Sequence, residues 1–380
     1  MSNYFKRVLF TEFSKKLLPE KVLLLLGARR VGKTKLIKDF IKEHPQNVYL
    51  QLNGEDIMDS DLLKERSVTN YQRLLSGIDV LVIDEAQHIP DIGLILKLIV
   101  DSIEGIKVIA TGSSMFDLVN NLGEPLVGRK NTLYLFPLAQ KEFAEFEDYK
   151  ETSQHLEQRL LFGGYPELEQ YSDWKEKEDY IYEIINSYLL KDILIFDGIK
   201  NSDKIYNLLR LIAFQIGKEV SLQELGNQLQ LSKNTVERYL TLLTKVFVIF
   251  KVEGFSKNLR KEITKTSRYY FYDNGIRNAL ISNFKRLTER NDTGDLWENY
   301  LASERVKKQH YNKIKARNFF WRTYDQQELD WLEETGEDLS GFEFKWSTTK
   351  VSKIPVAFSK AYPEASFEVI TKNNYLDFIT

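Results

Sequence analysis

A short segment near the start of the chain has the residue types and spacing of a phosphate-binding loop. Residues 27–34, GARRVGKT, match G-x-x-x-x-G-K-[ST] at every fixed position, between an apolar run and a helix-forming run. Gly27 and Gly32 allow backbone N–H groups to wrap an anion closely. Lys33 is expected to reach the β- and γ-phosphates, and the Thr34 hydroxyl to ligate Mg²⁺. The segment therefore predicts that the chain binds ATP with Mg²⁺.

A pair of acidic residues follows a second apolar run. Val80–Ile83 leads directly into Asp84 and Glu85, at the C-terminal end of an expected parallel strand, where open α/β sheets bind their ligands. Asp84 is expected to hold Mg²⁺ indirectly, by binding the groups that ligate the ion. Glu85 is expected to orient and deprotonate the attacking water. The pair predicts hydrolysis of the bound nucleotide as well as binding.

Three other residues are candidates for the same site. Ser113 follows another apolar run and could position the water or sense the γ-phosphate. Arg129, in LVGRKNTLYLF, could neutralise transition-state charge at its own site or at that of a neighbouring subunit. Arg30, inside the loop, is a candidate nucleotide contact. A lone loop arginine is often only solvated, and that alternative stays open for both arginines.

Residues 221–243 have the pattern of helix, turn and helix. Ser221 with Glu224 forms a capping box, and Ser232 caps the second helix. Apolar residues at helical spacing predict a small core: Leu222, Leu225, Leu229, Val236, Leu240 and Leu243. The start of the second helix is where recognition helices present side chains to the major groove. The candidate DNA contacts there are Lys233, Asn234, Thr235 and Arg238.

A predicted hairpin with a basic loop follows this helix. Its basic residues, suited to phosphate contacts, are Lys257, Arg260, Lys261, Lys265 and Arg268. Residues 200–290 hold 17 Lys and Arg against 8 Asp and Glu, in a chain whose net charge is −2. A basic reader module in an otherwise acidic chain favours duplex DNA as a partner. The alternative is a winged helix that acts as a lid or docks protein.

These residues need a scaffold, and the sequence predicts an α/β one. Strands are expected at Val22–Leu26, Val48–Leu52, Val80–Asp84 and Lys107–Thr111, with helices between them. Short apolar strands that alternate with helices predict a parallel sheet covered on both faces. Residues 138–200 predict helices broken at GGYP, residues 163–166. From about Asp292, a helix is followed by the strands NFFWRT, LDWLEE and GFEFKW.

The composition narrows the class of protein. The chain has 380 residues, of which 43% are hydrophobic, and no cysteine. Two to four domains are expected from this length, and disulfide frameworks and thiolate-bound zinc are excluded. No apolar run approaches the roughly 18 residues of a membrane span, and the N-terminus lacks a signal-peptide core. We therefore expect a cytoplasmic protein with no membrane partner.

With these motifs in view, the chain resembles a family of prokaryotic AAA-like P-loop ATPases with a C-terminal restriction-endonuclease-like domain of unknown function. The resemblance runs essentially end to end. Its motifs, in order, are GARRVGKT, VLVIDEAQHIPD, TGSS, LVGR, FPLAQKEF, GGYPE, TVERYLTLL, YYFYDNGIRNAL, WENYLASE, FWRT, ELDW and FEFKW. It implies an ATP-binding core, a winged-helix module and a nuclease-like fold whose activity is open.

Carboxylates near the C-terminus have the spacing of restriction-endonuclease-like sites. Asp330, Glu343 and Lys345 form D-x12-E-x-K, and strand alternation places Glu343 and Lys345 on one face. Asp330 and Glu343 could ligate Mg²⁺, with Glu298 completing the cluster and Lys345 activating water. Such a pattern also occurs on ordinary protein surfaces, so cleavage activity stays an open hypothesis.

The expected organisation has four parts. They are an ATPase core at 1–137, a helical lid or linker at 138–200, a winged helix at 201–283 and a restriction-endonuclease-like α/β domain at 284–380. The leading hypothesis is an ATP-hydrolysing protein that binds duplex DNA. The alternative is a nucleotide-gated switch or scaffold with a protein-docking winged helix and an inert C-terminal domain. An oligomeric motor ranks lower, and formation of a homo-oligomer stays open.

Overall fold

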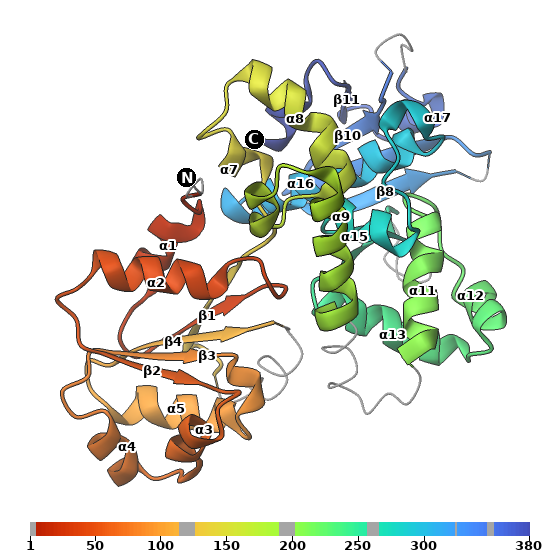
Figure 1. Cartoon of the computed structure of the whole chain (residues 1–380). Coiled ribbons are helices and arrows are strands. Elements are labelled where there is room, and N and C mark those ends of the chain that lie inside the picture. Colours follow the sequence, from red (N-terminus) through yellow and green to blue (C-terminus); the bar gives the residue numbers. More distant parts are fainter. Residues whose placement is uncertain (1–4, 114–125, 190–201, 257–265, 324, 348–352) are drawn as a thin grey trace. The chain divides into compact units, whose positions relative to one another are not determined.

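A computed structural model describes residues 5–113, 126–189, 202–256, 266–323, 325–347 and 353–380 (Figure 1). The chain divides into two compact units. The first, called here the N-terminal unit, contains residues 4–136 and 245–247. The second, the C-terminal unit, contains residues 1–3, 137–244 and 248–380.

The N-terminal unit is built on a five-stranded sheet in the order β2-β3-β4-β1-β5, with every pair of neighbours parallel. The strands are β1 (Val22–Leu26), β2 (Tyr49–Asn53), β3 (Val80–Asp84), β4 (Lys107–Gly112) and β5 (Lys130–Tyr134). All of β1 is buried, as expected for an all-apolar strand in the middle of a covered sheet. The predicted parallel sheet is confirmed, with β2 and β4 each ending one residue later than predicted.

Helices cover both faces of this sheet. They are α1 (Leu9–Lys16), α2 (Lys33–Glu43), α3 (Ile57–Lys64), α4 (Val68–Leu74) and α5 (Ile92–Ser102). Figure 1 shows α1 and α2 on one face and α3, α4 and α5 on the other. Helix α1 and strand β5 have no counterpart in the sequence prediction.

The strand order determines which residues meet at the ligand-binding edge. Strand β4 lies between β1 and β3, with Leu26 opposite Gly112 and Ile83 opposite Ala110. The C-terminal ends of these three strands therefore lie side by side. They carry the phosphate loop after β1, the acidic pair at the end of β3, and Thr111 with Ser113 at the end of β4.

The first part of the C-terminal unit is helical. Its elements are α7 (Gln140–Phe143), α8 (Tyr149–Phe162), the 3-10 turn Pro166–Gln170, α9 (Trp174–Glu183), the π-helical turn Ile184–Leu189, α11 (Ser202–Phe214), α12 (Leu222–Leu229) and α13 (Lys233–Lys245). Helix α8 ends at Gly163, as the GGYP break predicted. Ser221 accepts the backbone N–H of Glu224, and Ser232 accepts that of Thr235. The predicted N-caps Ser221 and Ser232 are therefore confirmed, but the Glu224 side chain accepts from Gln228 and the predicted capping box is not completed.

A mixed six-stranded sheet occupies the rest of this unit, in the order β11-β10-β9-β8-β6-β7. The strands are β6 (Ile249–Gly254), β7 (Ser267–Phe271), β8 (Arg317–Arg322), β9 (Glu328–Thr335), β10 (Asp338–Phe344) and β11 (Ser366–Ile370). The helices are α15 (Asn274–Leu280), α16 (Thr293–Tyr311), α17 (Val356–Ala361) and α18 (Tyr375–Ile379). The predicted hairpin β6-β7 joins the C-terminal strands, because Glu253 and Gly254 pair with Phe319 and Phe320 of β8.

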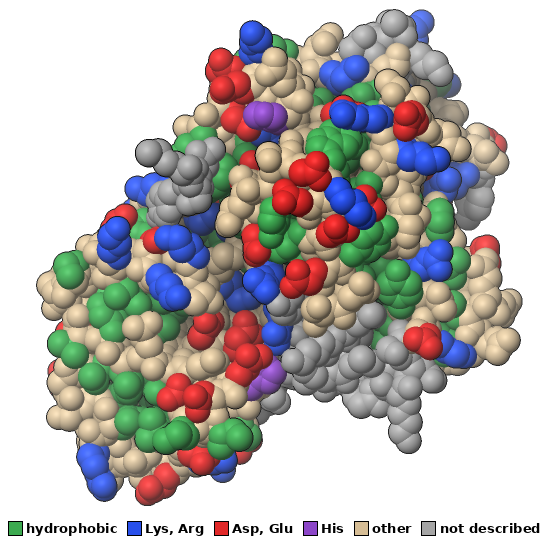
Figure 2. All heavy atoms as spheres, viewed as in Figure 1, with side chains coloured by type: hydrophobic (Ala, Val, Ile, Leu, Met, Phe, Trp, Pro, Cys, Tyr) green, Lys and Arg blue, Asp and Glu red, His purple; other side chains and the backbone are tan. Residues whose placement is uncertain are grey.

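Exposed apolar side chains gather on one face of the N-terminal unit. Figure 2 shows them over α3, α4 and α5, at the lower left. Ile57 is 75% exposed and Met58 80%. Within the described residues, no helix is long and apolar enough to cross a membrane.

Candidate functional site

The phosphate loop has a backbone shape that only glycine allows at two positions. Gly32 has a φ of +98° and caps the N-terminus of α2 without any side-chain hydrogen bond. A Cβ at Gly27 would lie 2.1 Å from the carbonyl oxygen of Leu135. The first turn of α2 therefore presents backbone N–H groups to the loop, which is how helix N-termini hold phosphate.

The lysine and threonine of the loop contact loop carbonyls and the acidic pair. Lys33 is 5% exposed, and its Nζ donates to the carbonyls of Gly27 at 2.9 Å and Ala28 at 3.1 Å. The Thr34 hydroxyl donates to Asp84 Oδ2 at 2.8 Å. Lys33 Nζ lies 4.0 Å from Glu85 Oε1. The loop after β1 and the acidic pair of β3 thus form one site.

Thr111 of β4 orients both acidic residues. Its hydroxyl group donates to Asp84 Oδ1, and the Thr111 hydroxyl oxygen accepts the backbone N–H of Glu85 at 3.0 Å. Glu85 has a φ of +48°, a left-handed conformation that turns the chain sharply after the strand. A Cβ at Gly54 would lie 2.4 Å from the Glu85 carbonyl oxygen, so glycine is required there for the two loops to approach.

Gln87 is a site residue that the sequence analysis missed. Its Nε2 donates to Glu85 Oε2 at 2.6 Å and to the Ser113 hydroxyl oxygen at 3.3 Å. Ser113 is 2% exposed and lies next to Gln87, and its predicted role toward the water or the γ-phosphate stays a prediction. The signal in the sequence was weak. Gln87 follows Glu85 by two positions, and only the left-handed turn at Glu85 brings its amide back to the carboxylate.

Arg7 is a second residue that the sequence analysis missed. Its guanidinium is buried and donates to the carbonyl of Val31, inside the phosphate loop, at 2.5 Å. It also donates to the carbonyl of Phe136 at 2.7 Å. Arg7 therefore fixes the phosphate loop to the segment that follows β5. No local pattern around Arg7 could have predicted contacts so distant in sequence.

The arginines of the loop differ from each other. Arg30 has a φ of +63° and is exposed, and its contact with a nucleotide stays a prediction. Arg29 forms an ion pair with Glu55 at 3.2 Å, and His88 Nε2 lies 3.6 Å from the same carboxylate oxygen.

Arg129 lies at the N-terminal end of the parallel strands, whereas the phosphate loop follows the C-terminal end of β1. Its carbonyl accepts the N–H of Val22, the first residue of β1, and its Nε donates to Asp101 at 2.5 Å. The five residues of β1 separate it from Gly27, a length of about 16 Å. The expectation that Arg129 could act on the nucleotide of its own chain is therefore wrong. A role at a neighbouring subunit stays a prediction.

The predicted carboxylate cluster comes from three elements of the C-terminal unit. Glu298 lies on α16 and accepts the Tyr270 hydroxyl at 2.8 Å. Asp330 lies on β9 and accepts the backbone N–H of Phe344 at 2.8 Å. Lys345 Nζ donates to Glu343 Oε1 at 2.5 Å, so these two side chains share a face as predicted.

Electrostatics tie the cluster together. Burial raises the pKa of Asp330 well above its usual value, and the charges of Glu298 and Glu343 raise it further. Burial also raises the pKa of Glu298. Burial lowers the pKa of Lys345, but its hydrogen bond to Glu343 and the surrounding carboxylates raise the pKa overall. Among the described residues, no three His, Asp or Glu side chains are arranged to hold a metal ion. The predicted three-carboxylate set is therefore not assembled here, and ligation by Asp330 with Glu343 stays a prediction.

The candidate DNA contacts are partly described. Lys233, Asn234 and Arg238 of α13 are exposed and Thr235 is half-buried, while Val236, Leu240 and Leu243 are buried. Lys257, Arg260, Lys261 and Lys265 lie outside the described residues.

Arg268 does not belong to a basic surface. Its side chain is buried, it pairs with Glu328 at 3.0 Å, and its guanidinium lies 4.4 Å from the Phe320 ring centroid. The expectation that Arg268 contacts phosphate is therefore wrong, because β7 carries it into the C-terminal sheet.

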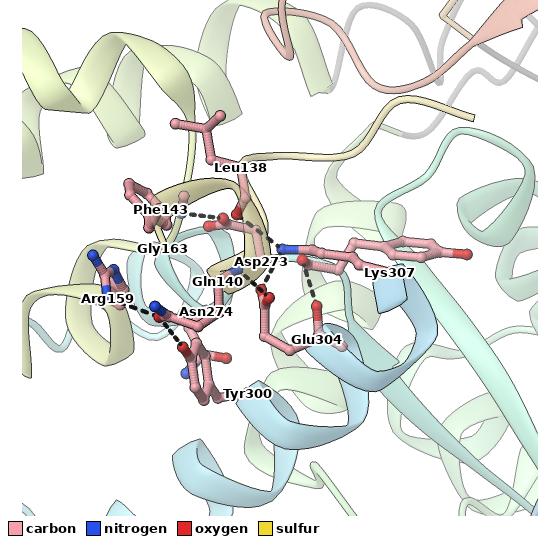
Figure 3. A pocket seen from close by; sticks show the side chains of 13 residues that line it. Leu138, Gln140, Phe143, Arg159, Gly163, Asp273, Asn274, Tyr300, Glu304 and Lys307 are labelled. Atoms are coloured by element: carbon pink, nitrogen blue, oxygen red, sulfur yellow. Dashed lines mark hydrogen bonds and ion pairs between the residues drawn. The ribbon is translucent and has the colours of Figure 1, made fainter. Parts of the chain in front are cut away.

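A second buried polar cluster surrounds a small cavity in the C-terminal unit (Figure 3). The Gln140 amide oxygen accepts from Arg159 at 2.7 Å and from the Tyr300 hydroxyl at 3.0 Å. Glu304 accepts the Gln140 backbone N–H at 2.6 Å and pairs with Lys307 at 2.7 Å. The cavity measures about 20 Å³, which is room for about one water molecule. The cavity is therefore too small to bind a nucleotide. The polar cluster around it joins the helices that carry its residues.

Comparison with protein families agrees with the geometry of the first site. Residues 19–144 match the family described as AAA domain. The N-terminal unit therefore contains an AAA-like P-loop nucleotide-binding domain. Residues 153–287 and 293–378 match two families described as domains of unknown function, DUF8612 and DUF4143.

Relatives share most of the chain. An uncharacterized protein of Methanocaldococcus jannaschii is 23% identical over 86% of this chain and 75% of its own length. An uncharacterized protein of Mycobacterium tuberculosis is 27% identical over 86% of this chain and 71% of its own length. Among solved structures, AMPPCP-bound DnaA from Aquifex aeolicus is 15% identical, with a TM-score of 0.31 over 64% of this chain and 89% of its own.

Proposed function

We propose that this chain binds ATP with Mg²⁺ and hydrolyses it at the site formed by the phosphate loop, Asp84 and Glu85. The observation that carries this proposal is the 2.8 Å hydrogen bond from Thr34 to Asp84, with Glu85 4.0 Å from Lys33. A phosphate loop alone supports binding. A carboxylate beside the loop lysine, at the edge where the γ-phosphate belongs, supports hydrolysis.

Each residue has a separate task in this proposal. Mg²⁺, when bound, neutralises phosphate charge, and Thr34 and Asp84 would hold it. Lys33 exchanges the carbonyls of Gly27 and Ala28 for phosphate oxygens. Glu85 accepts a proton from the water that attacks the γ-phosphorus.

Substitution of the loop lysine tests the binding step. Lys33→Ala removes the charge that reaches the phosphates, and we expect the affinity for ATP to fall at least about 100-fold in a fluorescent-nucleotide titration. Lys35→Ala is the matched control, because Lys35 lies on the same helix, is exposed and pairs with Asp39. Equal affinity in wild type and Lys33→Ala would contradict the proposal.

The proposal extends to duplex DNA as a partner of α13. The exposed Lys233 and Arg238 at the start and middle of this capped helix support it, as does the excess of basic residues in this segment. The competing hypothesis, a protein-docking switch, predicts binding that does not depend on these two charges.

A second candidate function is metal-dependent DNA cleavage by the carboxylate cluster. It is supported by the hydrogen bond between Lys345 and Glu343 and by the buried Asp330, whose pKa is raised by burial and then by the charges of Glu298 and Glu343. A buried carboxylate whose pKa is raised by neighbouring carboxylates is a group that a hard cation can bind in place of a proton. We expect Asp330→Asn to lose plasmid cleavage with Mg²⁺ or Mn²⁺ and to keep ATP turnover. Intact plasmid with the wild-type protein would end this second proposal and leave the first untouched.

A further inference from the structure

One buried polar atom beside Glu85 has no hydrogen-bond partner within the described residues. It is Oε1 of Gln87. The other end of this amide is fully engaged, with Nε2 donating to Glu85 at 2.6 Å and to Ser113 at 3.3 Å. Buried amide oxygens are costly to leave unpaired, and such atoms in native structures usually mark a missing water or ligand.

The chemistry of the carboxylate determines which end of the amide faces it. An ionised carboxylate only accepts hydrogen bonds, so the amide nitrogen must face Glu85 and the oxygen must face away from it. Ser113, buried at the end of β4, holds the nitrogen from a second direction. The amide plane is therefore fixed by two side chains, Glu85 after β3 and Ser113 after β4. Oε1 is held as an acceptor on the side of the amide that faces away from the carboxylate proposed as the base.

We propose that Gln87 is a catalytic residue whose Oε1 accepts a hydrogen bond from the attacking water, while its Nε2 holds Glu85 to take the other proton. This inference rests on the proposed ATP hydrolysis. In the step, the water oxygen forms a bond to the γ-phosphorus, and the bond from that phosphorus to the bridging oxygen breaks. Glu85 receives the proton, and ADP leaves with the electron pair of the broken bond. Two acceptors, Gln87 Oε1 and Glu85, orient the two hydrogens of the water so that its lone pair faces the phosphorus.

Two substitutions separate this role from a structural one. Gln87→Ala removes both contacts, and we expect kcat to fall about 10- to 100-fold while the Kd for ATP changes less than about twofold. Gln87→Glu keeps an acceptor but places a second carboxylate against Glu85. Like charges raise the pKa of one member of such a pair, so the acid limb of the pH–rate profile should move to higher pH. Gln72→Ala, at an exposed position on α4, is the matched control.

A double substitution tests whether the two residues act as a unit. If Gln87 works on the same water as Glu85, adding Gln87→Ala to Glu85→Gln should lower kcat by less than about twofold more. Wild-type turnover in Gln87→Ala, or a loss of ATP affinity as large as the loss of kcat, would overturn the inference while the ATPase proposal stands. Absence of ATP turnover in the wild-type protein would instead overturn the proposed function itself.

Discussion

The phosphate loop is shaped by its own residues and by one residue that is distant in the sequence. Gly27, Gly32, Lys33 and Thr34 act through the loop itself, whose shape depends on a φ of +98° at Gly32. Arg7 acts from outside it by joining the carbonyls of Val31 and Phe136. The loop is therefore held by helix α2, into which it leads, and by a buried cation at Val31.

Replacing Arg7 should weaken both the fold and the site. Arg7→Ala leaves two buried carbonyls without their charged donor, at a cost of about 3 kcal/mol in the free energy of unfolding. Because the loop loses its support, we also expect the affinity for ATP to fall about tenfold. Urea unfolding and nucleotide titration measure the two effects, with Arg73→Ala, an exposed residue of α4, as control. A free energy of unfolding and an ATP affinity equal to those of wild type would show that the contact of Arg7 with Val31 stabilises neither the fold nor the loop.

The sequence was informative about these residues only where their contacts are local. Lys33, Thr34, Asp84 and Glu85 follow apolar strands at fixed offsets, so a pattern could find them. Gln87 depends on a left-handed turn at Glu85, and Arg7 on contacts 24 and 129 positions away. Arg129 shows the converse, because its loop looked suitable while strand pairing places it at the N-terminal end of the strands.

At the scale of elements, ion pairs join α15 to the N-terminus of α16, and their effect on stability should depend on pH. Asp292, at the N-cap of α16, pairs with Arg277 at 2.5 Å and with Arg290 at 2.8 Å. Burial alone would raise the pKa of Asp292, but its hydrogen bonds to Arg290 and Arg277 lower it from 3.8 to about 2. The folded state therefore holds this carboxylate ionised more strongly than the unfolded chain does.

The ion pairs of Asp292 should make a contribution to the free energy of unfolding that depends on pH. The folded pKa lies below the unfolded one, so the contribution is present above about pH 4 and is lost as the pH falls toward 2. Asp292→Asn should lower the free energy of unfolding by about 2 kcal/mol at pH 7, and the deficit should shrink below pH 4. Urea titrations at several pH values measure it, with exposed Asp338→Asn as control. A deficit of the same size at pH 7 and pH 3 would rule out the ionic explanation.

Helix α13 makes a prediction about DNA at the same scale. If Lys233 and Arg238 each contact a phosphate, replacing both with Ala should reduce the slope of log affinity against log salt by about 2. All sequences should be weakened alike, because phosphate contacts carry no sequence information. Fluorescence anisotropy at several salt concentrations measures the slope, with exposed Lys150 and Lys175 replaced as control. An unchanged slope would remove α13 from any DNA interface.

Elements were predictable where their periodicity was strong. The buried strands β1 and β3 and the capped helices α12 and α13 lie where the sequence placed them. The partner of a strand was not predictable, because pairing is a long-range property. The hairpin β6-β7 was expected to stand as a separate wing, yet it pairs with β8 and extends the C-terminal sheet. That pairing is also why Arg268 is buried and not exposed to DNA.

Over the whole molecule, the two proposed chemistries lie in different units. The ATP site lies within residues 4–136, and the carboxylate cluster lies within residues 248–380. Substitutions at one site should therefore leave the basal chemistry of the other unchanged. An AAA-like domain is matched over residues 19–144, and the reaction at the first site is the central claim, on which the proposed role of Gln87 depends.

Single-turnover hydrolysis by the wild-type chain and by Glu85→Gln tests that claim most directly, because it separates chemistry from binding and release. The protein is preloaded with ATP labelled at the γ-phosphate, and the reaction is started with Mg²⁺. Glu85→Gln keeps the shape of the side chain and loses the base, so we expect ATP affinity within about threefold of wild type and phosphate formation at least about 100-fold slower. Phosphate formation by Glu85→Gln at the wild-type rate would contradict the assignment of Glu85, and with it the proposed mechanism of hydrolysis.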